Sequence, residues 1–395
     1  MKLQRIVAVL VVLVLGVSLV GIVGLGAGKI AVVFDVGRRG DLSFNDMAYN
    51  GASRAASDFG MKLDYLESSS ASDYLPNVRT FARDGSYDII IAVGYLLGDA
   101  VTAAAGEFPN QKFAIIDSVV TAPNVLSITF RENEASALAG ALAAMLAVQY
   151  NYKYVGAVFG IEIPVLFHFE AGYRFGIDWG LSYFQTHEKL AAKPNVGLLY
   201  VYTGSFDDVA KGKAAMETQL AQGAVCSYNV AGKLGIGMQQ AITEKHDSLG
   251  TRVGPPFFLG VDQDQDYQNH GLYGIASGMK RVDNGTYDAI KSVVDGTFKG
   301  EVLSLGLANG GGSLSDTAAL LDFIQIGIAG KAADPNEYYT IIANWSANRA
   351  SVPYWIWQAV DGLNAAILAG TITVPNANTK DEMGAVRAQY PLTGK

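Results

Sequence analysis

Residues 29–60, KIAVVFDVGRRGDLSFNDMAYNGASRAASDFG, join two different hydrophobic patterns through a polar loop. Residues 29–35 form a continuous apolar run that ends in a carboxylate, as is typical of a strand buried on both faces of a parallel sheet. From residue 46 onward the apolar positions lie three and four residues apart, as on one face of a helix. Gly60 predicts the end of that helix. We therefore expect a strand followed by a helix.

The same strand and helix unit recurs along the chain in two series. Further strands are expected at residues 62–66, 88–93, 113–117 and 125–130, and then, after a long Ala-rich helix over residues 134–149, at residues 154–159, 196–202, 224–230 and 257–261. Alternation of this kind predicts right-handed βαβ units and parallel sheets. Two such series predict an α/β protein with two doubly wound lobes.

The two series also suggest domain boundaries. We expect residues 29–150 to form the first lobe, with residues 277–312 returning to it. Residues 151–276 would form the second lobe, with residues 313–395 returning to that one. Open parallel sheets bind ligands beyond the carboxyl ends of their strands, so the cleft between the lobes is the expected site.

The N-terminus predicts export. Lys2 and Arg5 precede an uncharged apolar stretch over residues 6–28, which is typical of a secretory signal. The stretch is also long enough to span a bilayer, for which about 20 residues suffice. We expect residues 1–28 to be a signal peptide or an N-terminal membrane anchor. The folded chain would then lie outside the cytoplasm, associated with the cell membrane or secreted.

Composition excludes several classes of protein. The net charge of −8 argues against nucleic acid or an anionic lipid surface as a partner, since both select basic patches. The single cysteine, Cys226, excludes an internal disulfide framework. The sequence has no nucleophile elbow, zinc-protease motif or P-loop lysine motif. We therefore expect no enzyme activity, no cofactor and no metal.

Several polar residues and one aromatic residue stand where the chain should face the cleft. Asp35, Phe44 and Asn45 belong to the loop that joins the first predicted strand to its helix, and Asp117 and Asp262 end later strands. Polar neighbours flank Phe44 at a helix entrance, which suits stacking on a flat ligand better than core packing. A carboxylate at a strand end can equally cap a helix or pair on the surface, so both interpretations stay open from the residues alone.

The loop also carries a specific pattern. Residues 35–45 follow D-x-G-x-x-x-D-x-S-F-N, which resembles the signature of the basic membrane protein family. That family includes the purine-nucleoside receptors of ABC importers. Other similar segments follow in the same order: FAIIDS (113–118), TFRENE (129–134), IP and FEAG (163–172), GSFDD (204–208), VAG (230–232), GVD (260–262) and KRVD (280–283). The similarity runs from about residue 29 to residue 300 and fades beyond.

The resemblance implies a periplasmic-binding-protein type I fold, in which a three-stranded hinge joins two Rossmann-like lobes that close on a ligand. It further implies a nucleoside whose base lies between two aromatic rings. Phe44 would be one ring. The other would be Tyr228, two residues before the VAG segment, where the family usually has Phe. A tyrosine keeps the π face, and stacking contributes about 1–3 kcal/mol per base.

The resemblance assigns roles to further residues. Asp262 would accept hydrogen bonds from both ribose hydroxyls, and Lys280 would donate to ribose oxygens. Asp35 and Asp117 would accept from N–H groups of a purine, because an ionised carboxylate only accepts. Asn45, which can donate and accept, and Gly232 complete the set. The predicted ligand-binding residues are therefore Asp35, Phe44, Asn45, Asp117, Tyr228, Gly232, Asp262 and Lys280.

The implied partners are a purine nucleoside or similar small molecule and the permease and ATPase subunits of an ABC importer. The sequence departs from the family in two places, where Arg38 with Arg39 and Lys233 add cations near the expected cleft. These cations would favour a more anionic ligand. Three alternatives stay open: a protein of the same fold that binds a sugar or another small signal, a nucleoside-processing enzyme such as a calcium-dependent hydrolase, and a tethered sensor without a transporter.

Overall fold

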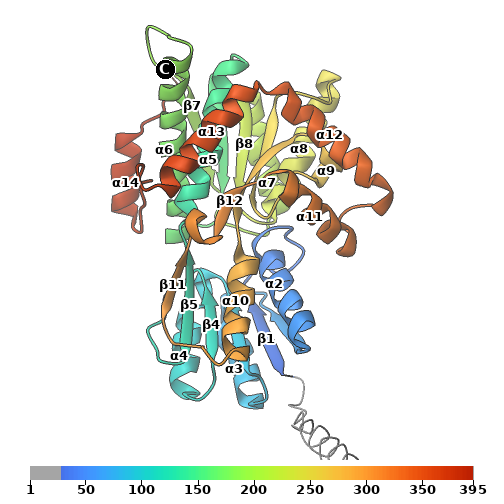
Figure 1. Cartoon of the computed structure of the whole chain (residues 1–395), viewed down its shortest axis with the longest axis vertical. Coiled ribbons are helices and arrows are strands. Elements are labelled where there is room, and N and C mark those ends of the chain that lie inside the picture. The colour runs from blue at the N-terminus through green and yellow to red at the C-terminus, as the bar shows by residue number, and fades with distance from the viewer. Residues whose placement is uncertain (1–27, 395) are drawn as a thin grey trace, which may run out of the picture.

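The computed structural model describes residues 28–394. They form two α/β lobes stacked along the long axis of the molecule (Figure 1). Each lobe contains one six-stranded sheet. The carboxyl ends of the strands in each sheet point toward the other lobe, so the loops that follow these strands meet between the lobes.

The first sheet has the strand order β11-β5-β4-β3-β1-β2, and all neighbours pair in parallel. Its strands are β1 (Lys29–Phe34), β2 (Lys62–Glu67), β3 (Ile89–Val93), β4 (Phe113–Ile116), β5 (Val125–Phe130) and β11 (Val302–Leu305), and its helices are α2 (Phe44–Phe59), α3 (Tyr74–Asp84), α4 (Gly98–Glu107) and α10 (Val282–Val294). Ile30 and Val32 pack in the core under α2 and α10, whereas Ala31 and Val33 pack under α3 and α4. Both faces of β1 are covered, which explains its continuous apolar run.

The second sheet has the order β12-β10-β9-β8-β6-β7, in which only the short β12 pairs antiparallel. Its strands are β6 (Tyr154–Phe159), β7 (Gly197–Tyr202), β8 (Ala224–Val230), β9 (Phe257–Asp262), β10 (Gly274–Lys280) and β12 (Gly312–Leu314), and its helices are α5 (Glu132–Gln149), α6 (Pro164–His187), α7 (Val209–Ala221), α8 (Leu234–Leu249) and the short α9 (Gln268–Gly271). Val155 and Phe159 face α5 and α6, and Val158 faces α7 and α8.

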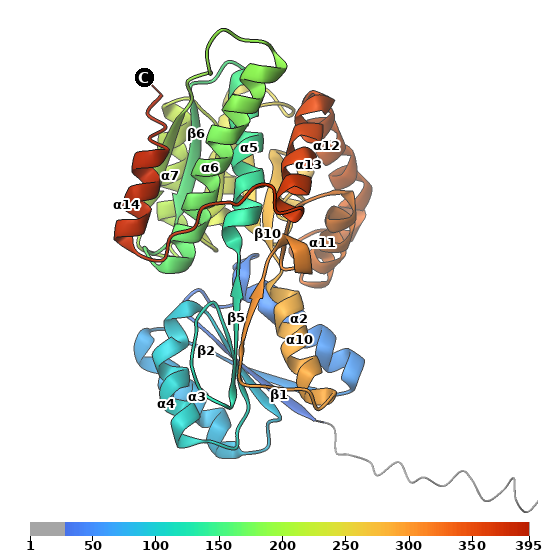
Figure 2. The same cartoon turned by 60° about the vertical axis from the view of Figure 1, so that its left-hand side comes forward.

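The chain crosses between the sheets three times, after β5, after β10 and after β11. In Figure 2 the paired strands β5 and β11 run side by side toward this junction. Two parallel-dominated sheets joined in this way confirm the predicted α/β, periplasmic-binding-protein type I fold.

The lobe boundaries in the structure differ from those predicted from the sequence. The predicted first lobe extended to residue 150, but α5 packs against α6 and lies in the core of the second lobe. The segment predicted to return to the first lobe began at residue 277, yet β10 holds residues 274–280 inside the second sheet. The pattern misled because α5 is apolar on all sides, so its sequence does not indicate which sheet it covers.

Helices after residue 316 pack on the second lobe (Figure 1). They are α11 (Thr317–Ala329), α12 (Tyr338–Ser351), α13 (Tyr354–Leu368) and α14 (Lys380–Gln389), and short 3₁₀ turns lie at Ala71–Asp73, Tyr95–Leu97, Leu307–Asn309 and Pro335–Glu337. α13 packs beside α5, and α14 packs beside α6.

The predicted leader lies outside the described residues, apart from its last residue, Gly28. Within residues 28–394, no helix reaches the length and apolarity that crossing a membrane requires.

Close packing of α5 on α6 depends on three glycines spaced four residues apart on α6. A Cβ atom added at Gly172, Gly176 or Gly180 would lie 2.0–2.7 Å from a backbone oxygen of α5. At Gly176 the nearest atom is the carbonyl oxygen of Ala137, at 2.0 Å. Backbone cannot move aside as a flexible side chain can, so any larger residue must push the helices apart.

We predict that Gly176→Ala lowers the free energy of unfolding by about 1–3 kcal/mol, the usual effect of overpacking. Gly362→Ala is the matched control, because Gly362 lies exposed within α13 and an added Cβ meets nothing within 4 Å. Alanine has less backbone freedom than glycine in the unfolded chain, so this control should be more stable than the wild type by about 0.5–1 kcal/mol. Urea unfolding measures both, and equal stabilities for the two variants would contradict the packing argument.

Candidate functional site

A cavity with about 600 Å³ of empty space, partly open to solvent, lies between the two lobes. The residues that line it are Asp35, Gly37, Asp41, Phe44, Asn45, Gly94, Tyr95, Leu96, Asp117, Ile163, Val165, Leu166, Phe169, Phe206, Val230, Ala231, Gly232, Val261, Asp262 and Lys280. Most follow the carboxyl ends of strands from both sheets, as expected for this fold. Seven of the eight sequence-predicted site residues line this one cavity.

Tyr228 is the exception, and the expectation that it faces the cleft is wrong. Its ring is fully buried in β8, within the core of the second lobe, where it contacts the rings of Phe169 and Tyr173. A residue in the middle of a central strand projects into a helix-covered core, whereas a ligand contact has to lie beyond the strand end. Tyr228 lies two residues before the end of β8, so its side chain does not reach the cavity.

The second lobe instead contributes Phe169 and Phe206 to the cavity. Phe169 is only 3% exposed and belongs mainly to the core. Phe206 is partly exposed and stands in the loop after β7, where its ring packs so closely on Gly160 that a Cβ there would lie 2.1 Å away. The signal for Phe206 was present in the sequence, because GSFDD was one of the segments that resembled the family.

The loop between β1 and α2 is held by Asp41. The carboxylate of Asp41 accepts hydrogen bonds from the backbone N–H groups of Ser43, Asn45 and Asp46, at 2.9–3.1 Å. These donors at the start of α2 have no partner within the helix, so Asp41 acts as its cap. The cap fixes Phe44 and Asn45 at the cavity wall. Burial raises the pKa of Asp41 to about 8.

Two buried acceptors in the cavity wall have no partner within residues 28–394. They are Oδ1 of Asn45 and Oδ1 of Asp117. Asn45 uses its amide nitrogen to donate to Asp35 and Asp41, at 3.2 Å each. Unsatisfied buried polar atoms are costly, so both oxygens are suited to accept hydrogen bonds from a ligand.

Asp117 and Asp262 hold unusual backbone conformations at the ends of β4 and β9. Their φ angles are 71° and 63°, in a region that non-glycine residues seldom adopt. Such strain concentrates at ligand sites, where the surrounding structure enforces it. Burial raises the pKa of both carboxyls, that of Asp117 to about 7.

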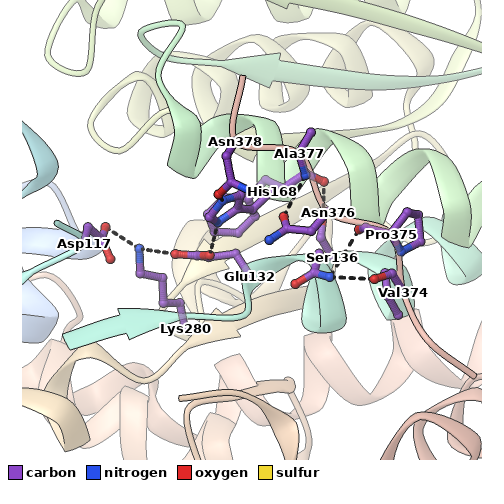
Figure 3. A network of polar contacts seen from close by, with 12 residues as sticks. Asp117, Glu132, Ser136, His168, Lys280, Val374, Pro375, Asn376, Ala377 and Asn378 are labelled. Atoms are coloured by element: carbon purple, nitrogen blue, oxygen red, sulfur yellow. Dashed lines mark hydrogen bonds and ion pairs between the residues drawn. The ribbon is translucent and has the colours of Figure 1, made fainter. Parts of the chain in front are cut away.

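Lys280 brings the positive charge to the cavity. Its side chain is 3% exposed, and its ammonium lies 2.5 Å from Asp117 Oδ2 and 3.2 Å from Glu132 Oε1 (Figure 3). Burial by itself favours the neutral amine, but Asp117, Glu132 and Asp262 raise the pKa of Lys280 above its ordinary value. Lys280 therefore stays charged, and an ammonium has three N–H groups to donate.

Direct hydrogen bonds link the lobes around the cavity. Ser43 Oγ donates to Asp262 Oδ2 at 2.6 Å, and Gln265 Nε2 donates to the carbonyl of Leu42 at 2.7 Å. The lobes are thus in contact across the cleft.

The additional cations singled out in the sequence do not line the cavity. Arg39 lies with its guanidinium 3.4 Å from the centroid of the Tyr49 ring, and its backbone N–H donates to Glu67. Neither Arg38 nor Lys233 is among the lining residues. The expectation that these residues would favour an anionic ligand is therefore not supported by their positions. Within residues 28–394, no cluster of three His, Cys, Asp or Glu side chains could hold a metal ion.

This fold and this cavity define a two-lobed solute-binding protein. Residues 29–325 match the model of the PnrA-like ABC transporter substrate-binding proteins, and the chain belongs to this family. The resemblance noted from the sequence is thereby confirmed.

Related proteins agree with the assignment. The chain is 38% identical to an uncharacterized lipoprotein of Pyrococcus horikoshii, covering 90% of this chain and 85% of that protein. It is 30% identical to the ABC transporter nucleoside-binding protein BmpA of Lactococcus lactis, covering 72% of this chain and 80% of that protein. A crystal structure of an ABC transporter solute-binding protein from Aeropyrum pernix superposes with a TM-score of 0.83 at 33% identity, covering 92% of this chain and 97% of that one.

The carboxyl group of Asp35 offers a test of the site's electrostatics. Burial raises its pKa from 3.8 to about 6, against the opposing hydrogen bonds from Gly37 and Asn45. The folded protein then keeps a proton that the unfolded chain has already lost, so stability falls as pH rises from about 4 to about 6.

Asp35→Asn removes this titration. Relative to the wild type, the variant should gain about 2–3 kcal/mol of stability between pH 4 and pH 7. Urea unfolding of the ligand-free protein at several pH values measures the difference, and Asp99→Asn, at an exposed position, controls for removal of a charge. Parallel pH profiles of Asp35→Asn and the wild type would show that burial does not raise this pKa.

Proposed function

We propose that this ABC transporter substrate-binding protein captures a purine nucleoside outside the cytoplasm, by closure of its two lobes on the ligand. The observation that carries the proposal is the cavity wall itself. Phe44 from one lobe and Phe206 from the other line a single cavity whose wall also holds two unpaired buried acceptors. A flat ring that carries N–H donors complements both features.

The purine base would stack between Phe44 and Phe206. Each ring belongs to a different lobe and is only partly buried, so each keeps surface for a ligand. Stacking on an aromatic side chain contributes about 1–3 kcal/mol per base and depends little on the identity of the base. Phe206 takes the role that the resemblance gave to Tyr228.

Hydrogen bonds would select a purine with N–H groups on its edge. Asn45 and Asp117 each present a free acceptor oxygen, and Asp35 lies beside Asn45. Asp262 and Lys280 would bind the ribose, the carboxylate by accepting from hydroxyls and the ammonium by donating to an oxygen. Gly232, with φ of 54°, brings backbone to the cavity wall where a side chain would take up room.

Closure of the two lobes would depend on the shape of the ligand. The lobes are joined by three chain crossings that can act as a hinge, and a ligand favours the closed arrangement only through contacts that exist in that arrangement. A base in contact with both Phe44 and Phe206 makes such contacts.

The proposed location and partners rest on the relatives and on the N-terminus. One relative described above is named a lipoprotein, and another is named an ABC transporter nucleoside-binding protein. Residues 6–28 of this chain form the apolar stretch expected of a signal peptide or membrane anchor. A protein tethered outside the cell membrane would deliver its nucleoside to the permease and ATPase subunits of an importer.

We predict that Phe44→Ala and Phe206→Ala each weaken inosine binding by about 10- to 100-fold, because each removes one stacking face. Phe59→Ala is the matched control, since Phe59 lies at the other end of α2 and packs near Tyr287, away from the cavity. Titration calorimetry measures the affinities. If either cavity variant binds inosine with wild-type affinity, the substituted ring does not contact the ligand.

The charge of the cavity gives a second prediction. Lys280 is the sole cation among the described lining residues, and Asp117 and Glu132 already neutralise it. A phosphate would meet uncompensated carboxylates, so inosine and guanosine should bind about tenfold or more tightly than their 5′-monophosphates. Competition calorimetry with both forms tests this. Tighter binding of a monophosphate, or of free ribose, would replace the nucleoside with another ligand class.

A further inference from the structure

A chain of alternating charges leads from the cavity to residues 374–387, called the C-terminal segment below (Figure 3). Lys280 lies between Asp117 and Glu132, as described above. The other oxygen of Glu132, Oε2, lies 2.8 Å from Nδ1 of His168. The second ring nitrogen of His168, Nε2, lies 3.1 Å from Oδ1 of Asn378. Four charged groups and one amide thus form a continuous series of contacts.

The contacts of His168 define its charge. Both ring nitrogens face oxygen atoms that accept hydrogen bonds, an arrangement that favours a proton on each nitrogen and hence an imidazolium. Burial and Lys280 oppose this charge, but Glu132 and Asn378 outweigh them and raise the pKa of His168 above its ordinary value. The charges therefore alternate in sign from Asp117 through Lys280 and Glu132 to His168.

The C-terminal segment is fixed at the same place. Asn133, next to Glu132, donates from its side-chain amide to the carbonyls of Val374 and Pro375, at 3.0 and 3.2 Å. Further along, Arg387 forms two hydrogen bonds to the fully buried Glu170 of α6, at 2.6 and 2.8 Å. The segment thus holds the first turn of α5, directly after the chain crosses from the first lobe.

This segment lies outside residues 29–325, which match the family model. Its contacts nevertheless reach, through two side chains, the ammonium group that lines the cavity. The contact is indirect, because it passes through His168 and Glu132.

We propose that His168 and Asn378 are positioning residues for Lys280, through which the C-terminal segment tunes the affinity for the ribose of the ligand. This inference rests on the proposed nucleoside site. Lys280 donates one N–H to Asp117 and forms an ion pair with Glu132, which leaves an N–H group for a ribose oxygen. Glu132 has two cationic partners, His168 and Lys280, so its negative charge is divided between them. Without the imidazolium, Glu132 attracts Lys280 more strongly and draws it away from the ligand.

The test compares two ligands that differ only in the ribose hydroxyls, adenosine and 2′,3′-dideoxyadenosine. Calorimetry with full-length His168→Gln should show about tenfold weaker binding of adenosine, the effect of one charge-assisted hydrogen bond, and no change for the dideoxy compound. Asn378→Ala should weaken adenosine binding by about threefold, because its contact is exposed. Asn376→Ala is the matched control, since among residues 28–394 its side chain bonds only to the adjacent N–H of Ala377.

The charge of His168 has a readout that needs no ligand. The chain has four histidines, so the His168 signal in a ¹H–¹³C NMR titration is the one missing from His168→Gln. It should titrate above the ordinary histidine pKa of about 6.5, and Asn378→Ala should lower that value.

Each outcome decides between the proposals. Adenosine affinity unchanged in His168→Gln overturns the positioning role and leaves the nucleoside site standing. Equal losses for both ligands overturn it too, because they indicate general damage to the fold. If the wild type binds neither compound, the nucleoside function fails, and the NMR titration alone then decides the charge series: a neutral His168 at pH 6 overturns it.

Discussion

Lys280 places a positive charge where the chain passes from one lobe to the other, and the ammonium is almost completely buried there. A buried charge has to be paired, because water no longer solvates it. Its partners come from different parts of the fold, Asp117 from the first sheet and Glu132 from the start of α5. The ion pair between Lys280 and Asp117 joins the two lobes at the cavity. The positions of the lobes and the chemistry of the cavity wall therefore depend on the same contact.

The wall around this pair combines apolar rings with acceptors. Four aspartates line the cavity, and burial raises the pKa of each of them, so charged carboxylates there benefit from ligand N–H and O–H groups. The hydrogen bond from Ser43 to Asp262 shows how one of these acceptors is satisfied across the cleft without a ligand. A ribose hydroxyl would offer the same carboxylate a donor of the same kind. Partner exchange of this sort suits a protein that binds and later releases its solute.

Much of the fold and site could be predicted from the sequence, because buried parallel strands are apolar at every position and their carboxyl ends converge. That geometry placed Asp35, Asp117 and Asp262 near the cleft, and the family resemblance then assigned them to the ligand. Tyr228 was misplaced because every residue of β8 is buried, so the sequence does not distinguish core-facing from cleft-facing positions. The role of His168 was equally hidden, since its partners Glu132 and Asn378 are distant in sequence and the resemblance fades before residue 378.

In the proposed complex, two rings from opposite lobes hold one flat base beside the Lys280 ion pair. A crystal structure of the protein grown with inosine tests this most directly. We expect the purine between Phe44 and Phe206, its edge near Asn45 and Asp117, and the ribose against Asp262 and Lys280. Inosine bound elsewhere, or bound in this cavity without contact to both rings, would contradict the account.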